Sequence, residues 1–296
     1  MPIDNAHYHG WQGSLRSPWL ATLALVRVAL LQVLRRKLYW IVLALGLAQF
    51  FLYWSIIYAV TQLDPPPAAR ERMLEAFGFS AQPQPGRPSG YVLFMERQSV
   101  VVMILLAFSG SVLVGSDFRL GSLPFYLSRR IDRRHYIAGK LLAIGAVVSL
   151  LTTVPALVLF IEYGMFTSST DYWIDNWRLP VEVIAYGAVL AVTLSVLLVT
   201  LSAYLQRLAP IAITWSSLFV LLPLLRSALV RETHNHYWNL IDPWRNMSLV
   251  GRLAFDDFDS PFERRLALWA LAILSAILAA MLVALVRRVR SVDVVE

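Results

Sequence analysis

The sequence predicts an all-α integral membrane protein with six transmembrane helices and a helix at the membrane interface before them. Of the 296 residues, 58% are hydrophobic, and the mean hydropathy is +0.60. A soluble chain of this size would contain far fewer unbroken apolar runs. The third observation is that basic residues concentrate in alternate loops between these runs, as they do in multi-pass membrane proteins.

Six apolar runs are each long enough to enter a bilayer, whose hydrocarbon core takes roughly 20 helical residues to cross. The second and fifth runs are the shortest. Outer loops are expected at 61–97, 162–182 and 226–265, and a cytoplasmic loop at 115–140, so that 38–290 forms one six-span domain with a tail at 291–296. The predicted spans are Leu38–Val60, Ser99–Val114, Leu141–Ile161, Val183–Leu205, Ala209–Leu225 and Leu266–Val286.

The first 37 residues precede the spans. Met1–Ser17 is polar, and Pro18–Lys37 is apolar but is interrupted by Arg27 and ends in Arg35, Arg36 and Lys37. Its apolar part is short for a span, so we expect an amphipathic helix that lies along the inner membrane surface. The alternative is a seventh span.

The charges give the orientation. The N-terminus, the 115–140 loop, the turn at Arg207 and the C-terminus together hold 15 Lys+Arg and 5 Asp+Glu, whereas the other three loops hold 11 and 14. The positive-inside rule therefore predicts a multi-pass protein of the cytoplasmic (inner) membrane with both termini in the cytoplasm. The net charge of +7 is then expected to face anionic membrane lipid and a cytoplasmic partner, not nucleic acid.

The loop from Gly115 to Lys140 carries six of the 26 basic residues, too many to lie in lipid, where an Arg costs roughly 2.5–3.5 kcal/mol at mid-bilayer. Ser122 is a suitable N-cap for a short helix, and Pro124 falls in its first turn. Asp132 is placed to cap a second helix that leads into the third span. The physical pattern alone equally allows an interfacial turn held by anionic lipid.

This loop resembles the cytoplasmic loop of type-2 ABC transporter permeases. The chain departs from that pattern at Arg130, where the family commonly has Pro, and the six-span hydropathy layout agrees with the family along the whole chain. The matching residues are Asp117, Gly121, Ser122, Leu123, Leu127, Ser128, Arg133, Gly139 and Lys140.

The resemblance implies that the short helix is a cytoplasmic coupling helix that docks into a separate ABC ATPase subunit. It also implies that a second permease copy, identical or related, completes the transporter, and that ATP and magnesium bind to the partner ATPase. The residues expected at the docking surface are Asp117, Gly121, Ser122, Leu123, Phe125, Tyr126, Leu127, Arg129 and Arg133.

No phosphate-binding loop is present. Gly139-Lys140 is followed by Leu141, and Arg134 stands where the first glycine of G-x-x-x-x-G-K-[ST] would be. We therefore expect no enzymatic activity and no cofactor on this chain, with ATP hydrolysis on another polypeptide.

The other candidate sites in the sequence lack residues that their chemistry requires. His234 and His236 face opposite sides of a helix and lack a third ligand at diagnostic spacing, and the Asp256–Asp259 cluster lacks the glycine and later Glu of a calcium loop. We expect no metal site. The predicted spans contain few ionisable groups, which argues against a proton-coupled carrier. The zero cysteines exclude thiolate chemistry.

The sequence thus favours a permease subunit of an ATP-driven ABC transporter, an exporter, whose substrate the sequence leaves open. The alternative is a non-transporting membrane scaffold or assembly factor whose cytoplasmic loop binds a partner.

Overall fold

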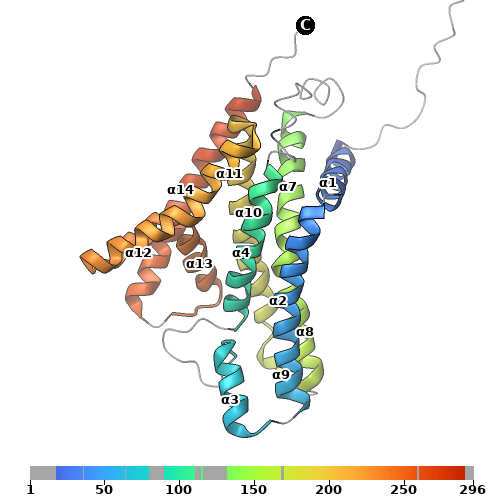
Figure 1. Cartoon of the computed structure of the whole chain (residues 1–296), viewed down its shortest axis with the longest axis vertical. Coiled ribbons are helices and arrows are strands. Elements are labelled where there is room, and N and C mark those ends of the chain that lie inside the picture. The colour runs from blue at the N-terminus through green and yellow to red at the C-terminus, as the bar shows by residue number, and fades with distance from the viewer. Residues whose placement is uncertain are drawn as a thin grey trace, which may run out of the picture.

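The computed structural model describes residues 18–35, 37–63, 65–79, 90–110, 115, 132–167, 170–258 and 260–290, and every regular element among them is a helix. Figure 1 shows an elongated bundle, with α1 and the C-terminal end of α14 at one end and α3 and α9 at the other. We call these the α1 end and the α3 end. The elements are α1 (Pro18–Leu34), α2 (Lys37–Gln62), α3 (Pro67–Ala76), α4 (Gly90–Gly110), α7 (Arg133–Leu151), α8 (Thr153–Thr167), α9 (Thr170–Asp175), α10 (Leu179–Leu205), α11 (Leu208–Ser216), the π-helix η2 (Ser217–Leu221), α12 (Leu222–Thr233), the 3-10 helix η3 (His236–Ile241), α13 (Pro243–Ala254) and α14 (Pro261–Arg290).

Six helical segments among the described residues are long and apolar enough to cross a membrane, which confirms the prediction of an all-α membrane protein at this level. Each overlaps one predicted span, although several boundaries differ. They are Tyr39–Gln62, Gly90–Ser109, Arg133–Thr167, Leu179–Leu205, Leu208–Thr233 and Pro261–Val289.

The second of these segments begins at Gly90, not at Ser99 as predicted, and this corrects the boundary of the 61–97 loop. The charged pair Glu96–Arg97 lowers the local hydropathy just before Ser99, although the helix continues through both residues. Both side chains have partners inside the protein. Glu96 accepts a hydrogen bond from Ser248, and Arg97 donates one from Nη1 to the Tyr53 hydroxyl at 3.3 Å.

The third segment joins α7 and α8 through an interruption at Thr152, and it continues past the predicted end at Ile161 to Thr167. Pro155 lacks the N–H that would bond the carbonyl one turn earlier, and the Thr152 hydroxyl donates to the Val148 carbonyl at 2.9 Å. At about 1.5 Å per residue, 35 residues reach beyond a hydrocarbon core of about 30 Å.

The fifth segment runs through α11, η2 and α12 and ends at Thr233, beyond the predicted Leu225. The π-helical turn η2 ends at Leu221, two residues before Pro223, which cannot donate a main-chain hydrogen bond. The helix ends at Thr233, and its C-cap His234 has a left-handed φ of 51°. The predicted 226–265 loop is accordingly helical for most of its length.

The centre of the bundle is α10, which packs against α4, α7, α8, α13 and α14. Its inward residues, among them Tyr186, Leu190 and Leu194, are fully buried. Trp215 of α11 is buried too, and its indole N–H donates to the Met103 carbonyl of α4 at 3.1 Å. This core fixes α4 and α11 side by side.

The helix expected at Pro18–Lys37 is α1, and it packs against the beginning of α7. The rings of Trp19 and His135 meet edge to face with centroids 4.8 Å apart. Figure 1 shows α1 strongly foreshortened and α2 along its length, so the two axes cross. Leu20 and Leu23 lie on an exposed face that is itself largely apolar, which differs from the amphipathic pattern that we expected.

Candidate functional site

The predicted docking surface falls almost wholly outside the described residues. Only Arg133 is described, as the half-buried first residue of α7. The others are Asp117, Gly121, Ser122, Leu123, Phe125, Tyr126, Leu127 and Arg129.

The two ends of the 115–140 loop are fixed at the α1 end of the bundle. A Cβ added to Gly115 would lie 2.8 Å from the carbonyl oxygen of Gln206, so Gly115 contacts the turn between α10 and α11. At the other end of the loop, His135 contacts Trp19 of α1. The Arg288 side chain, near the end of α14, donates to the Ala203 carbonyl at 3.5 Å. The basic segments that the sequence places on one side of the membrane therefore approach one another.

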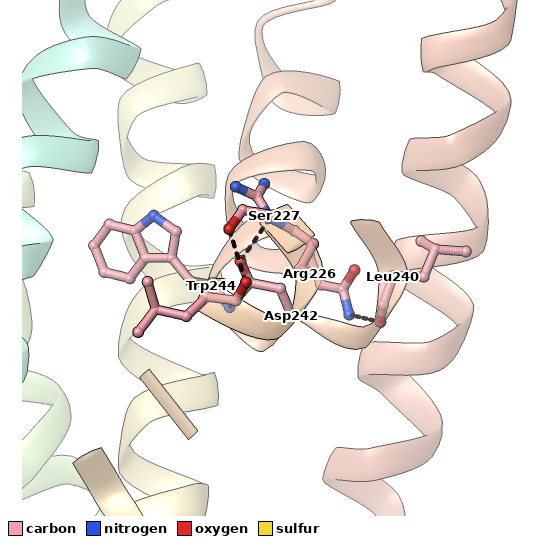
Figure 2. Close-up of polar contacts among 7 residues, drawn as sticks. Arg226, Ser227, Leu240, Asp242 and Trp244 are labelled. Atoms are coloured by element: carbon pink, nitrogen blue, oxygen red, sulfur yellow. Dashed lines mark hydrogen bonds and ion pairs between the residues drawn. The ribbon is translucent and has the colours of Figure 1, made fainter. Parts of the chain in front are cut away.

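A second region, around α13, holds charges among the helices. Asp242 begins α13 as its N-cap, and its Oδ1 accepts the Trp244 N–H at 2.9 Å, while Pro243 takes the first helical position, where a missing N–H costs little. Figure 2 shows Asp242 between the Trp244 main chain and the side chain of Arg226. The Asn246 amide donates to the Leu240 carbonyl at 2.9 Å and so ties α13 to η3.

The ion pair between Arg226 and Asp242 links α12 to the start of α13, with 3.6 Å between Nε and Oδ2. The Asp242 side chain is 1% exposed, whereas that of Arg226 is 29% exposed. Burial raises the pKa of Asp242 above its ordinary value, although main-chain N–H groups of Arg245 and Trp244 and the charge of Arg226 act in the opposite direction.

Arg245, Ser248 and Arg252 recur at the three- and four-residue spacing that places side chains on one face of a helix. The Ser248 hydroxyl donates to Glu96 of α4, and Arg252 pairs with Glu263 of α14 at 3.6 Å. Burial lowers the pKa of Arg245, and the negative charge of Glu96 partly offsets this. We call Glu96, Arg245, Ser248, Arg252 and Glu263 the α13 polar cluster.

Gly251 allows α13 to approach α10 closely. A Cβ at this position would overlap the ring of Tyr186, which is 1% exposed. Since α13 is buried from Asn246 to Arg252, its polar side chains have to be satisfied by the surrounding helices and not by water. The arrangement therefore places the charged side chains of α13 among α4, α10 and α14.

The expectation that ionisable groups are scarce within the spans needs correction. Glu96 and Arg97 lie within α4, and Glu162, which is 3% exposed, lies within α8. Sequence reasoning assigned all three to loops, because hydropathy falls at a charged residue whether or not the helix continues. The spacing of Arg245, Ser248 and Arg252 was a visible signal of a polar face, but nothing local identifies Glu96 and Glu263 as its partners.

Of the residues that we considered as metal ligands, His236 lies beside an aromatic ring and Asp256 beside an arginine. His234 follows the last residue of α12, and the His236 ring lies 6.2 Å from that of Phe262. Asp256 pairs with Arg264 at 3.9 Å, and both side chains are exposed.

No protein-family model matches the chain, and no curated protein matches it.

Proposed function

We propose that this chain is the permease subunit of an ATP-driven transporter of the type-2 ABC class, an exporter, coupled through its 115–140 loop to a separate ATPase subunit. The proposal rests on the loop resemblance together with six helices suited to spanning a membrane. It places both termini and the loop in the cytoplasm and the chain in the inner membrane. ATP and magnesium belong to the partner ATPase.

One observation carries the proposal beyond the sequence: α1 packs on the first turns of α7, which form the end of the 115–140 loop. A Cβ on Gly139 would lie 3.2 Å from Leu25 Cδ1 and 3.4 Å from Thr22 Cγ2, so the two helices are in close contact there. In this proposal a displacement of the loop reaches both α1 and α7, because the two helices are in contact at Gly139.

The break at Thr152 gives this displacement a place to bend the span. Its main chain departs from the regular helix, with φ −110° and ψ −65°, between α7 and α8. Helices bend most readily where a proline removes a main-chain hydrogen bond, and Pro155 lies three residues later. In this proposal α7 rocks with the ATPase while α8 stays packed on α2.

The pathway forms between two permease copies, identical or related. The segments Leu208–Thr233 and Pro261–Val289 bury little of their surface within the chain. Exposed apolar side chains on them, such as Ile213 and Trp269, are available to lipid or to a second copy.

Purification of the tagged full-length chain from its native membrane tests the proposal. We expect a polypeptide with a phosphate-binding loop to co-purify, and ATP turnover to require that polypeptide. A stable partner without ATPase activity would contradict the proposal and support a membrane scaffold. Turnover of ATP by the chain alone would contradict it as well.

A further inference from the structure

An open apolar groove of about 410 Å³ runs between α4 and the α11–η2–α12 segment. Val100 and Ile104 line it from α4, Phe219 and Pro223 line it from the opposite wall, and Trp244 of α13 lines it as well. Its volume lies within the range of roughly 300–1,000 Å³ found for sites that bind small molecules. Both walls belong to candidate membrane spans, so hydrocarbon is the expected medium around it.

The Arg226–Asp242 ion pair adjoins residues that line the groove, although neither of its two members lines the groove itself. Phe219 and Pro223 lie on one face of η2 and α12, and the next residues on that face, three and four positions on, are Arg226 and Ser227. Trp244 of α13 also connects the groove to the ion pair. Its side chain lines the groove, and its main-chain N–H donates to Asp242, which pairs with Arg226.

The ion pair presents its cation outward. Asp242 contacts Arg226 through Nε and is itself almost completely buried, whereas the Arg226 side chain keeps 29% of its surface exposed. Figure 2 shows the two amino groups of the guanidinium turned away from Asp242. No hydrogen bond to these amino groups comes from the residues that the structure describes. A guanidinium with two free amino groups is suited to bind a phosphate with paired hydrogen bonds.

We propose that this groove binds a membrane amphiphile with a phosphate head, its hydrocarbon chain between α4 and α11–α12 and its phosphate on the amino groups of Arg226. The inference does not depend on ATP-driven transport, because it concerns a site on the isolated chain. Asp242 acts here as a positioning residue that fixes the guanidinium and leaves its outer edge open.

Three probes distinguish the contribution of the hydrocarbon chain from that of the phosphate head. Dodecyl phosphate has both groups, dodecanol has only the hydrocarbon chain, and inorganic phosphate has only the anion. Each is titrated into the purified full-length protein in a neutral sugar detergent, and the apparent affinity is taken from the rise in melting temperature. We expect dodecyl phosphate to bind at least about tenfold more tightly than either other probe, since a charge-assisted pair contributes about one power of ten or more.

Substitutions of Arg226 test whether its guanidinium binds the phosphate. Arg226→Gln should bind dodecyl phosphate no better than dodecanol. Arg226→Lys keeps a cation beside Asp242 but lacks the planar guanidinium, so its affinity for dodecyl phosphate should lie between those of Arg226→Gln and the wild type. Arg231→Gln removes the same charge from an exposed position on the same helix and should behave as the wild type. Ala107→Phe, which fills the groove, should weaken binding of both chain-bearing probes.

Equal binding of dodecyl phosphate and dodecanol by the wild type overturns the proposal, as does undiminished preference for dodecyl phosphate in the two Arg226 variants. If inorganic phosphate raises the melting temperature as much as dodecyl phosphate does, the site binds a free anion and the proposal is overturned.

Because the chain contains no cysteine, Val220→Cys provides a further test. Rapid disulfide dimerisation of this variant in membranes would show that a second copy covers the groove, and would overturn the proposal too.

Discussion

The hydroxyl of Ser248 on α13 donates a hydrogen bond to the carboxylate of Glu96 on α4, across 152 positions in the sequence. This contact attaches a short polar helix to a candidate membrane span. With the Arg252–Glu263 pair one turn further along the same face of α13, it joins α4 and α14 through a helix that buries charge. The residues of α13 are thus held by partners from two different spans.

Replacement of Glu96 tests that attachment. Glu96→Gln keeps the shape but removes the charge that balances Arg245. We expect a loss of about 1–3 kcal/mol in the free energy of unfolding, the typical cost of losing a hydrogen bond to a charged group and leaving its partner buried. Thermal unfolding in detergent measures it. Glu71→Gln, on an exposed position of α3, is the matched control and should leave the melting temperature unchanged. Equal melting temperatures for both variants would refute the structural role of Glu96.

The stability contributed by Asp242 should depend on pH. Burial raises its pKa, so the folded state holds the proton more strongly than the unfolded state does. The resulting stabilisation is complete below the unfolded pKa of about 3.9 and is lost as pH rises through the raised folded value. The melting temperature of the wild type relative to Asp242→Asn should therefore fall as pH is increased from about 4 to 7. A constant difference over this range would show that Asp242 is not perturbed.

The packing of α1 on α7 can be tested by a disulfide. A Cβ on Gly139 would lie 3.4 Å from the Leu25 Cβ, close to the separation of about 3.8 Å that a disulfide requires. We expect Leu25→Cys combined with Gly139→Cys to cross-link under mild oxidation, visible as a mobility shift that reductant reverses. Leu23→Cys with Gly139→Cys is the control, because Leu23 is 59% exposed and lies on the outer face of α1. Cross-linking of both pairs at equal rates would contradict this packing.

The six spans could be predicted from sequence because membrane insertion depends on local hydropathy, which each segment carries by itself. The start of α4 could not, since the charges of Glu96 and Arg97 become compatible with a helical segment only through partners elsewhere in the chain. The same holds for α13. Its residues show a polar face, but the pairing of Arg252 with Glu263 and of Arg226 with Asp242 depends on how α12 and α14 pack. The docking residues from Asp117 to Arg129 lie outside the described residues and stay a prediction from resemblance.

The orientation in the membrane is a prediction from the charge distribution, and labelling can test it. Single cysteines at Ser128 and Ser89 should react with a membrane-impermeant maleimide from opposite sides, Ser128 from the cytoplasm, because the loop of Ser128 carries the basic excess. Intact cells and inverted vesicles provide the two accessible faces. Labelling of both positions from one side would eliminate the six-span topology.

The last prediction concerns the short helix of the 115–140 loop. If Phe125 and Leu127 fill a groove on an ATPase subunit, truncation of either removes an apolar anchor of a small interface. Such a truncation typically costs about 2 kcal/mol or more, roughly a thirtyfold loss of affinity. We expect Arg129 to remain near water, so that its charge affects the association rate and its salt dependence more than the final affinity.

The mutants therefore have an expected order in a pull-down at two salt concentrations. Phe125→Ala and Leu127→Ala should release the ATPase while the chain still inserts and folds, and Arg129→Ala should mainly change the response to salt. A lipid-held turn predicts the reverse, because the arginine then supplies the contact with anionic lipid and the apolar truncations leave partner binding untouched. A complex that survives the combined Phe125→Ala and Leu127→Ala change at both salt concentrations would exclude this helix from coupling, even if an ATPase partner exists.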